Sequence, residues 1–126
     1  MVTKDFEELF ACLNARGVKD IDVFVDSAPE NIRQLLLALT DFGFGDVGLT
    51  EDDFSKPGAI VQLGVAPNRV DLVTAIDGVR FEEAWSGRVS GTYGRRPVFY
   101  LGRADLIRNK RASGRAQDLA DLESLE

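Results

Sequence analysis

The sequence contains no histidine and only one cysteine, Cys12, among its 126 residues. The absence of histidine excludes Ser-His-Asp and Cys-His catalysis and also excludes metal binding by imidazole. A single cysteine cannot form a disulfide within the chain, and it argues against a cysteine-based zinc site. Acid–base or metal chemistry must therefore depend on carboxylates, lysine, tyrosine or the one thiol. We interpret Cys12 as a small packing residue of a first helix.

Long apolar runs are also absent. The longest aliphatic run, Leu35 to Leu39, is far too short to span a bilayer. The first residues, Met1 to Glu8, do not resemble a signal peptide. We therefore expect a cytoplasmic protein without a membrane partner. The length and the 44% hydrophobic content are ordinary for a single globular domain, here residues 1–126.

Charge is distributed unevenly along the chain. The whole chain has a net charge of −6, which argues against a general coat for nucleic acid. The stretch from Arg88 to Arg115, in contrast, contains eight basic residues and one acidic residue, Asp105. Such a segment can receive a polyphosphate or a stretch of nucleic acid. It is also typical of a solvated helix face, and both interpretations stay open.

Hydrophobic periodicity predicts a small α/β domain with at least one helix between strands. Ile21, Val23 and Val25 alternate with Asp20, Asp22, Phe24 and Asp26, which predicts a strand over Asp20–Asp26. Spacing and turn residues predict the other elements. We expect helices at 5–15, 81–85, 104–111 and 117–125, a helix that starts at Ser27–Glu30 with Ser27 as its cap and runs to about Phe42, and a short helical turn at 50–53. The strands 59–65 and 69–75 are expected to form one hairpin, and the strands 88–93 and 97–101 a second.

Three aspartates on predicted strands are candidates for metal chemistry. Asp20 and Asp22 are two residues apart on one strand, so their side chains project from the same face. Carboxylates held this close repel each other unless a cation lies between them, and Mg²⁺ favours such ligands. Asp71 lies in another apolar strand and joins them if the two strands are neighbours. Taken alone, an Asp-x-Asp pair is more often a pair of solvated residues or turn caps.

The wider sequence around these aspartates resembles the nucleotidyltransferase superfamily. It is most similar to small bacterial members related to the minimal and aminoglycoside nucleotidyltransferases. The resemblance covers most of the chain and is carried by the segments Lys19–Asp26, Gln62–Val65, Asn68–Thr74, Ile76–Val79, Leu106–Ala112 and Gln117–Asp121. It implies a small mixed-sheet fold with flanking helices. The implied activity is metal-dependent transfer of a nucleoside monophosphate from a nucleoside triphosphate to an acceptor, with release of pyrophosphate.

The resemblance also implies roles for individual residues. Asp20 and Asp22 match the metal-binding pair of the family, and Mg²⁺ or Mn²⁺ is the implied cofactor. Asp71 matches the third acidic position, which has a metal-binding and a catalytic role. In the C-terminal region, which often faces the site, the candidates for contact with nucleotide or phosphate are Lys110, Arg111 and Arg115. For Lys110, a position on a solvated helix face is an equal alternative.

One unit of the family's pattern is missing. The family normally has a strand and a helix before the Asp-x-Asp strand, and the Gly-Gly or Gly-Ser turn that joins them holds the triphosphate. Here Ala15–Val18 leads directly to Lys19 and Asp20, so the fold is expected to be truncated by one strand–helix unit. The Asp20–Asp26 strand loses a neighbour. We therefore expect an exposed sheet edge that a second copy of the chain covers, which gives a homodimer.

Two other functions stay open at this point. Loss of the phosphate cradle is severe for phosphoryl transfer, so the chain is alternatively a non-catalytic, dimeric interaction module comparable to an antitoxin. The basic segment would then meet a protein or a nucleic acid. The third interpretation is a plain α/β domain whose aspartates cap turns. Dependence on a divalent cation and a nucleotide separates the first function from the other two.

Overall fold

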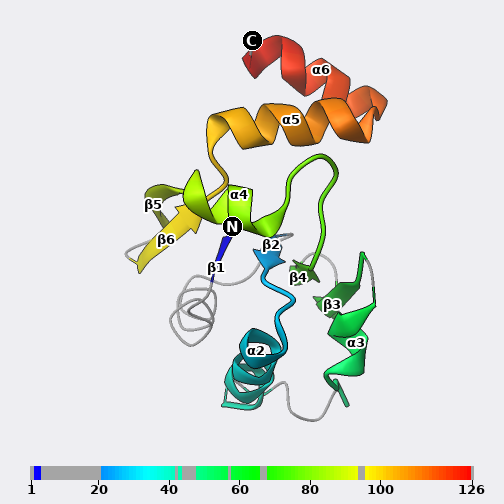
Figure 1. Cartoon of the computed structure of the whole chain (residues 1–126), viewed down its shortest axis with the longest axis vertical. Coiled ribbons are helices and arrows are strands. Elements are labelled where there is room, and N and C mark those ends of the chain that lie inside the picture. Colours follow the sequence, from blue (N-terminus) through cyan, green and yellow to red (C-terminus); the bar gives the residue numbers. More distant parts are fainter. Residues whose placement is uncertain are drawn as a thin grey trace.

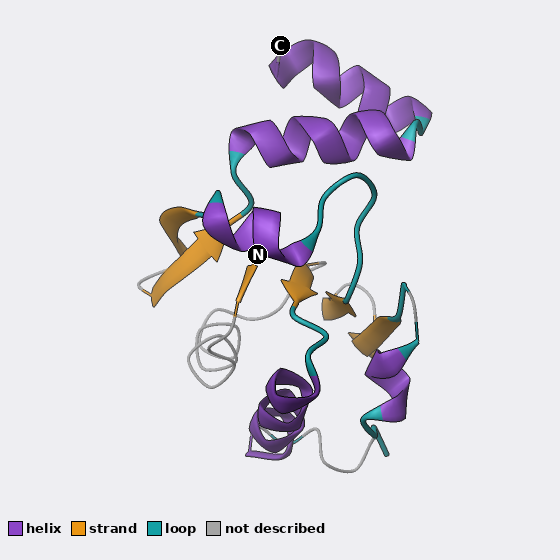
Figure 2. Ribbon diagram, viewed as in Figure 1, coloured by secondary structure: helices purple, strands orange, loops and turns teal. Residues whose placement is uncertain are grey.

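The computed structural model describes residues 2–3, 21–41, 43, 48–56, 58–65, 68–93 and 96–125. Within these ranges the chain forms a mixed β-sheet, a separate β-hairpin and several helices (Figure 1, Figure 2), which confirms the predicted small α/β fold. The elements are β1 (Val2–Thr3), β2 (Ile21–Val25), α2 (Pro29–Asp41), α3 (Asp52–Ser55), β3 (Ile60–Val65), β4 (Asn68–Val73), α4 (Phe81–Ser86), β5 (Val89–Tyr93), β6 (Arg96–Tyr100), α5 (Arg103–Ser113) and α6 (Ala116–Leu125).

Part of the predicted organisation lies outside these residues. The first helix, with Cys12, is not among them, and neither are Lys19 and Asp20. For the described part of the chain, no helix combines the length and apolar character that crossing a membrane requires.

The main sheet has the strand order β1-β2-β4-β3. β2 pairs in parallel with β1 and with β4, whereas β3 and β4 form an antiparallel hairpin. A parallel neighbour requires a long crossover, and α2 lies in the segment that connects β2 to the hairpin. β5 and β6 form the second predicted hairpin, which is a sheet of its own.

The first core lies between one face of the main sheet and the helices α2 and α3. α2 contributes Ile32, Leu35, Ala38 and Leu39 at helical spacing, and Leu36 packs against this core partly buried. α3 contributes Phe54, which is fully buried. The sheet contributes the alternate residues of its strands, which are Val23, Val25, Val61, Leu63, Val70 and Leu72. Burial of these side chains holds the sheet against α2.

The second core lies on the opposite face of the sheet and is smaller. Phe24 meets Phe81 of α4 edge to face, with ring centroids 5.2 Å apart. Trp85 meets Phe99 of β6 in the same manner at 5.5 Å, which connects the hairpin to this core. The buried residues of the cluster are Val2, Phe24, Val79, Phe81 and Ala84. Both faces of the sheet are therefore covered around Phe24.

β2 is not the exposed sheet edge that the sequence analysis expects. Val2 and Thr3 pair with its last residues, Phe24 and Val25, and Val23 and Val25 are fully buried in the first core. The expectation is wrong because a two-residue strand is too short to leave a periodic signal in the sequence. The proposed homodimer through an exposed Asp20–Asp26 strand thereby loses the reason given for it.

A matched pair of substitutions on α2 tests the first core. Leu35 is 0% exposed, so Leu35→Ala should lower the free energy of unfolding by about 2–5 kcal/mol through lost burial and a new cavity. Leu37 is 68% exposed, and Leu37→Ala should change it by less than about 0.5 kcal/mol. Urea denaturation of both variants measures the difference. Equal losses would contradict this orientation of α2.

Candidate functional site

Asp22 and Asp71 lie side by side on neighbouring strands. They are direct register partners in the parallel pairing of β2 with β4, so their side chains project from the same face of the sheet. This face is the one that carries Phe24, opposite the first core. Asp20, the other predicted metal ligand, lies outside the described residues. The structure thus brings together the two predicted ligands that it describes.

Both aspartates line a pocket of about 670 Å³, a size typical of sites for small molecules. Its lining residues come from the sheet, from the segment after β4 and from the C-terminal part of α5 with the residues after it. Figure 1 shows the segment after β4 rising toward α5. The other polar residues of the pocket are Asp77, Asn109, Ser113 and Arg115, and the remaining lining residues are Gly58, Ile60, Val73, Ala75 and Ile76. The described lining therefore has an acidic side on the sheet and a guanidinium beyond the end of α5.

Asp71 has a buried carboxylate oxygen without a hydrogen bond. The side chain is 16% exposed, and Nε of Arg69 lies 3.2 Å from its Oδ1. Neither atom has a hydrogen-bond partner among the described residues, so this contact is an ion pair without hydrogen-bond geometry. Divalent cations such as Mg²⁺ bind carboxylate oxygens, and both Asp71 and the exposed Asp22 beside it present a carboxylate to the pocket. The donor set therefore fits Mg²⁺ or Mn²⁺, with Arg69 as a competing positive charge.

Close packing fixes the segment after β4 against α5. Gly78 has a φ of +77°, and a Cβ atom there would lie 2.7 Å from the Cβ of Ala112 and 3.0 Å from the carbonyl oxygen of Arg108. Glycine alone permits both this conformation and this approach without strain. Asn109 adds a hydrogen bond from Nδ2 to the backbone oxygen of Asp77 at 3.0 Å. These contacts set two pocket residues, Asp77 and Asn109, against each other.

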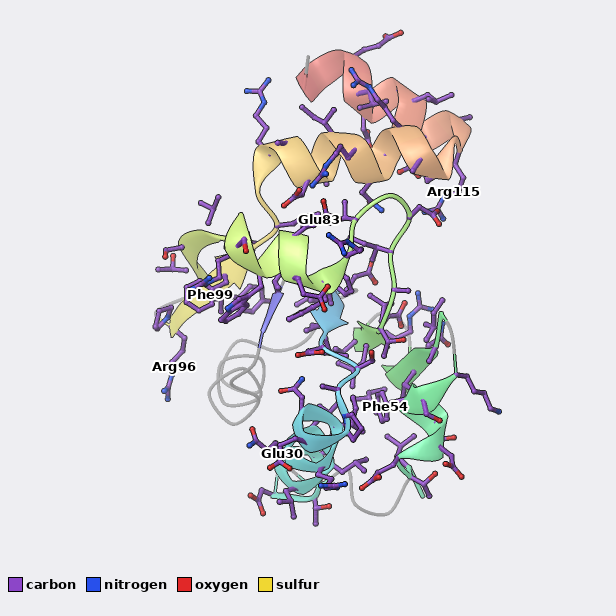
Figure 3. The ribbon with its side chains drawn as sticks, in the orientation of Figure 1. Glu30, Phe54, Glu83, Arg96, Phe99 and Arg115 are labelled. Carbon is purple, nitrogen blue, oxygen red and sulfur yellow. The ribbon has the colours of Figure 1, made fainter. Side chains whose placement is uncertain are left out.

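Charged side chains hold α5 against α4. Arg108 donates to Glu83 at 2.9 Å and also pairs with Asp105, the buried residue of α5. Figure 3 shows Glu83 in the space between the two helices. The backbone N–H of Arg80 donates to Glu83 at 3.1 Å. That N–H foremost, and then the guanidinium groups of Arg108 and Arg80, lower the pKa of Glu83 from 4.5 to about 2.

Of the three basic residues considered for nucleotide contact, Arg115 lines the pocket. Figure 3 shows it at the corner between α5 and α6. Lys110 instead connects the two helices, because its Nζ lies 2.9 Å from Asp121 and 3.3 Å from Asp118. These carboxylates, Asp121 foremost, raise the pKa of Lys110. Arg111 is exposed on α5, and neither it nor Lys110 lines the pocket.

Sequence reasoning does not single out Asp77, Asn109 or Ser113 as site residues. Asn109 and Ser113 are four residues apart on α5, so helical spacing alone puts them on one face. Nothing in the spacing indicates that this face meets the sheet. Asp77 precedes a glycine and has the pattern of an ordinary turn, which hides its place beside the pocket.

Among the residues that the structure describes, no group of three or more cysteine, aspartate or glutamate side chains is arranged to hold a metal ion. No protein-family model, no curated protein and no solved structure matches the chain. The function has to be argued from the pocket and from the sequence itself.

The lowered pKa of Glu83 predicts that the protein loses stability in acid. Because its pKa is lowered in the folded state, its contribution is complete above about pH 4.5 and is lost as the pH falls toward about 2. The difference in unfolding free energy between the wild-type protein and Glu83→Gln should therefore shrink steadily over this interval. Urea denaturation at a series of fixed pH values measures it. A difference that stays constant would show that Glu83 does not link α4 to α5 through its charge.

Proposed function

We propose that this chain is a nucleotidyltransferase-like protein that binds a divalent cation and a nucleoside triphosphate in the pocket beside Asp22 and Asp71. The proposed reaction transfers a nucleoside monophosphate to an acceptor and releases pyrophosphate. The observation that carries the proposal is the direct register pairing of Asp22 with Asp71 at the sheet side of the pocket. The sequence resemblance implies metal binding by these two carboxylates together with that of Asp20.

The local charge supports cation binding. Two ionised carboxylates on directly paired residues repel each other, and a cation between them relieves the repulsion. Arg69 offsets part of the negative charge from its position 3.2 Å from Asp71. A hard divalent cation can bind oxygens of both carboxylates. In the proposal, Asp22 and Asp71 hold the ion together with Asp20, which lies outside the described residues.

The residues of the chain have separate parts in this proposal. Bound Mg²⁺ supplies charge neutralisation and polarisation of the phosphoryl group. Arg115 donates N–H groups to phosphate oxygens from beyond the end of α5, and Nδ2 of Asn109 has a second N–H group besides the one that it donates to Asp77. The carboxylate of Asp71 accepts a hydrogen bond from the attacking hydroxyl group. In the proposal the phosphate contacts therefore come from α5 and from Arg115 just beyond its end, in place of the missing glycine turn.

Calorimetric titration with Mn²⁺, followed by each of the four common nucleoside triphosphates, tests the proposal. Wild-type protein should bind Mn²⁺ saturably and then bind a triphosphate. Asp22→Asn and Asp71→Asn should each weaken Mn²⁺ binding roughly tenfold or more, because each removes a charged oxygen ligand. Asp41→Asn changes an exposed carboxylate at the end of α2 and is the matched control with unchanged binding.

Two results would contradict the proposal. Mn²⁺ binding that is equally strong in both site variants would show that the ion lies elsewhere. Triphosphate that fails to bind to the metal-loaded protein would exclude the transferase reaction, and the chain would then be better described as an interaction module.

A further inference from the structure

At the corner between α5 and α6, the carboxylate of Asp118 accepts hydrogen bonds from three side chains. Its Oδ2 accepts hydrogen bonds from the hydroxyl of Ser113 and from Nε of Arg115, the latter at 3.0 Å. Its Oδ1 lies 3.3 Å from Nζ of Lys110. The side chain is 15% exposed, and these donors, Ser113 foremost, lower the pKa of Asp118. Asp118 therefore stays ionised and holds three groups from one position.

Arg115 needs such a partner to keep a defined direction. It follows Gly114, whose φ of +65° ends α5, and its side chain is 79% exposed. A long side chain at so open a position has many rotamers, and fixing one of them costs entropy. The contact with Asp118 engages Nε. A guanidinium carries its other N–H groups on the two terminal nitrogens, and these can bind an anion in the pocket that Arg115 lines.

We infer that Asp118 is a positioning residue that directs the guanidinium of Arg115 into the pocket, so that α6 completes the wall that binds the phosphate groups of the substrate. The inference rests on the proposed function. It gives α6 an indirect role in binding, although none of its residues from Ala116 onward lines the pocket. Asp118 acts on the substrate through Arg115 and does not touch it.

A purely structural part for Asp118 is the competing explanation, and Asp121 separates the two. Asp118 and Asp121 both pair with Lys110 and so both connect α6 to α5. Asp118 also contacts Arg115, whereas Asp121 is contacted by Gln117 at 3.1 Å. Removing either carboxylate weakens the connection between the helices, but only removal of Asp118 releases Arg115. The two substitutions are therefore a matched pair.

The experiment is calorimetric titration of inorganic pyrophosphate into the full chain, with and without saturating Mn²⁺. Arg115→Ala should weaken binding about tenfold, the effect of one charge-assisted hydrogen-bonded contact. Asp118→Ala should weaken it about five- to tenfold, and Asp121→Ala less than about twofold. Asp118→Ala should have no further effect in the Arg115→Ala background, because it acts through Arg115. Asp118→Asn, which preserves volume, replaces Asp118→Ala if thermal unfolding shows that the alanine variant does not fold.

Three results would overturn the inference. The first is an equal loss in Asp118→Ala and Asp121→Ala, which would make Asp118 only a connection between helices. The second is an additive effect of Asp118→Ala on top of Arg115→Ala. The third is wild-type protein that binds Mn²⁺ through Asp22 but binds no pyrophosphate, a result that leaves the metal site intact. Conversely, pyrophosphate binding that depends on Arg115 and Asp118 while no Mn²⁺ binds would support the inference and contradict the proposed metal chemistry.

Discussion

The direct pairing of β2 with β4 is the interaction on which the rest of the structure depends. It joins two apolar strands of the sheet in parallel, and its register aligns Val23 with Leu72 and Asp22 with Asp71. The first pair faces α2 and belongs to the larger core, while the second faces the pocket. Because side chains alternate along a strand, a slip of one residue would carry the aspartates into the core and the aliphatic residues into the pocket. The burial that stabilises the sheet thus also fixes the two carboxylates.

The two sides of the pocket are held by different forces. The sheet side is fixed by apolar burial around residues such as Leu35 and Leu72, both fully buried. On the helical side, the buried residue of α5 is a carboxylate, Asp105. The helix is attached through Arg108 and Asn109 and through the close approach of Gly78. One side therefore depends on volume and shape, and the other depends on charge and hydrogen-bond direction. A pocket built in this manner has a rigid floor and a wall that is positioned by a few polar contacts.

The sequence predicts most of the described elements and part of the candidate site. Alternation and turn residues find β2, both hairpins and the helices, because burial on one face leaves a regular pattern. Asp22 and Asp71 are predictable because a charged residue in an apolar strand is conspicuous. Val2 and Thr3 are not, since a strand of two residues has no period, and so the covering of β2 is missed.

The helical wall is harder to predict for a different reason. Lys110 and Arg115 look alike in a basic segment, yet one is paired with two carboxylates of α6 and the other reaches the pocket. The turn at Gly114 lies between these two residues and changes the direction of the chain. A count of charges along the sequence does not reveal that direction.

The polar attachment of α5 and α6 has a consequence for how the pocket responds to its surroundings. Attraction between exposed charges is largely screened beyond about 8 Å at physiological ionic strength and beyond about 3 Å in molar salt. The pairs of Arg108 with Glu83 and of Lys110 with Asp121 have side chains of this partly exposed kind. Apolar burial in the sheet has no such screening. At molar ionic strength the attachment of the helical wall therefore weakens before the sheet is disturbed, because only the wall is held by charges.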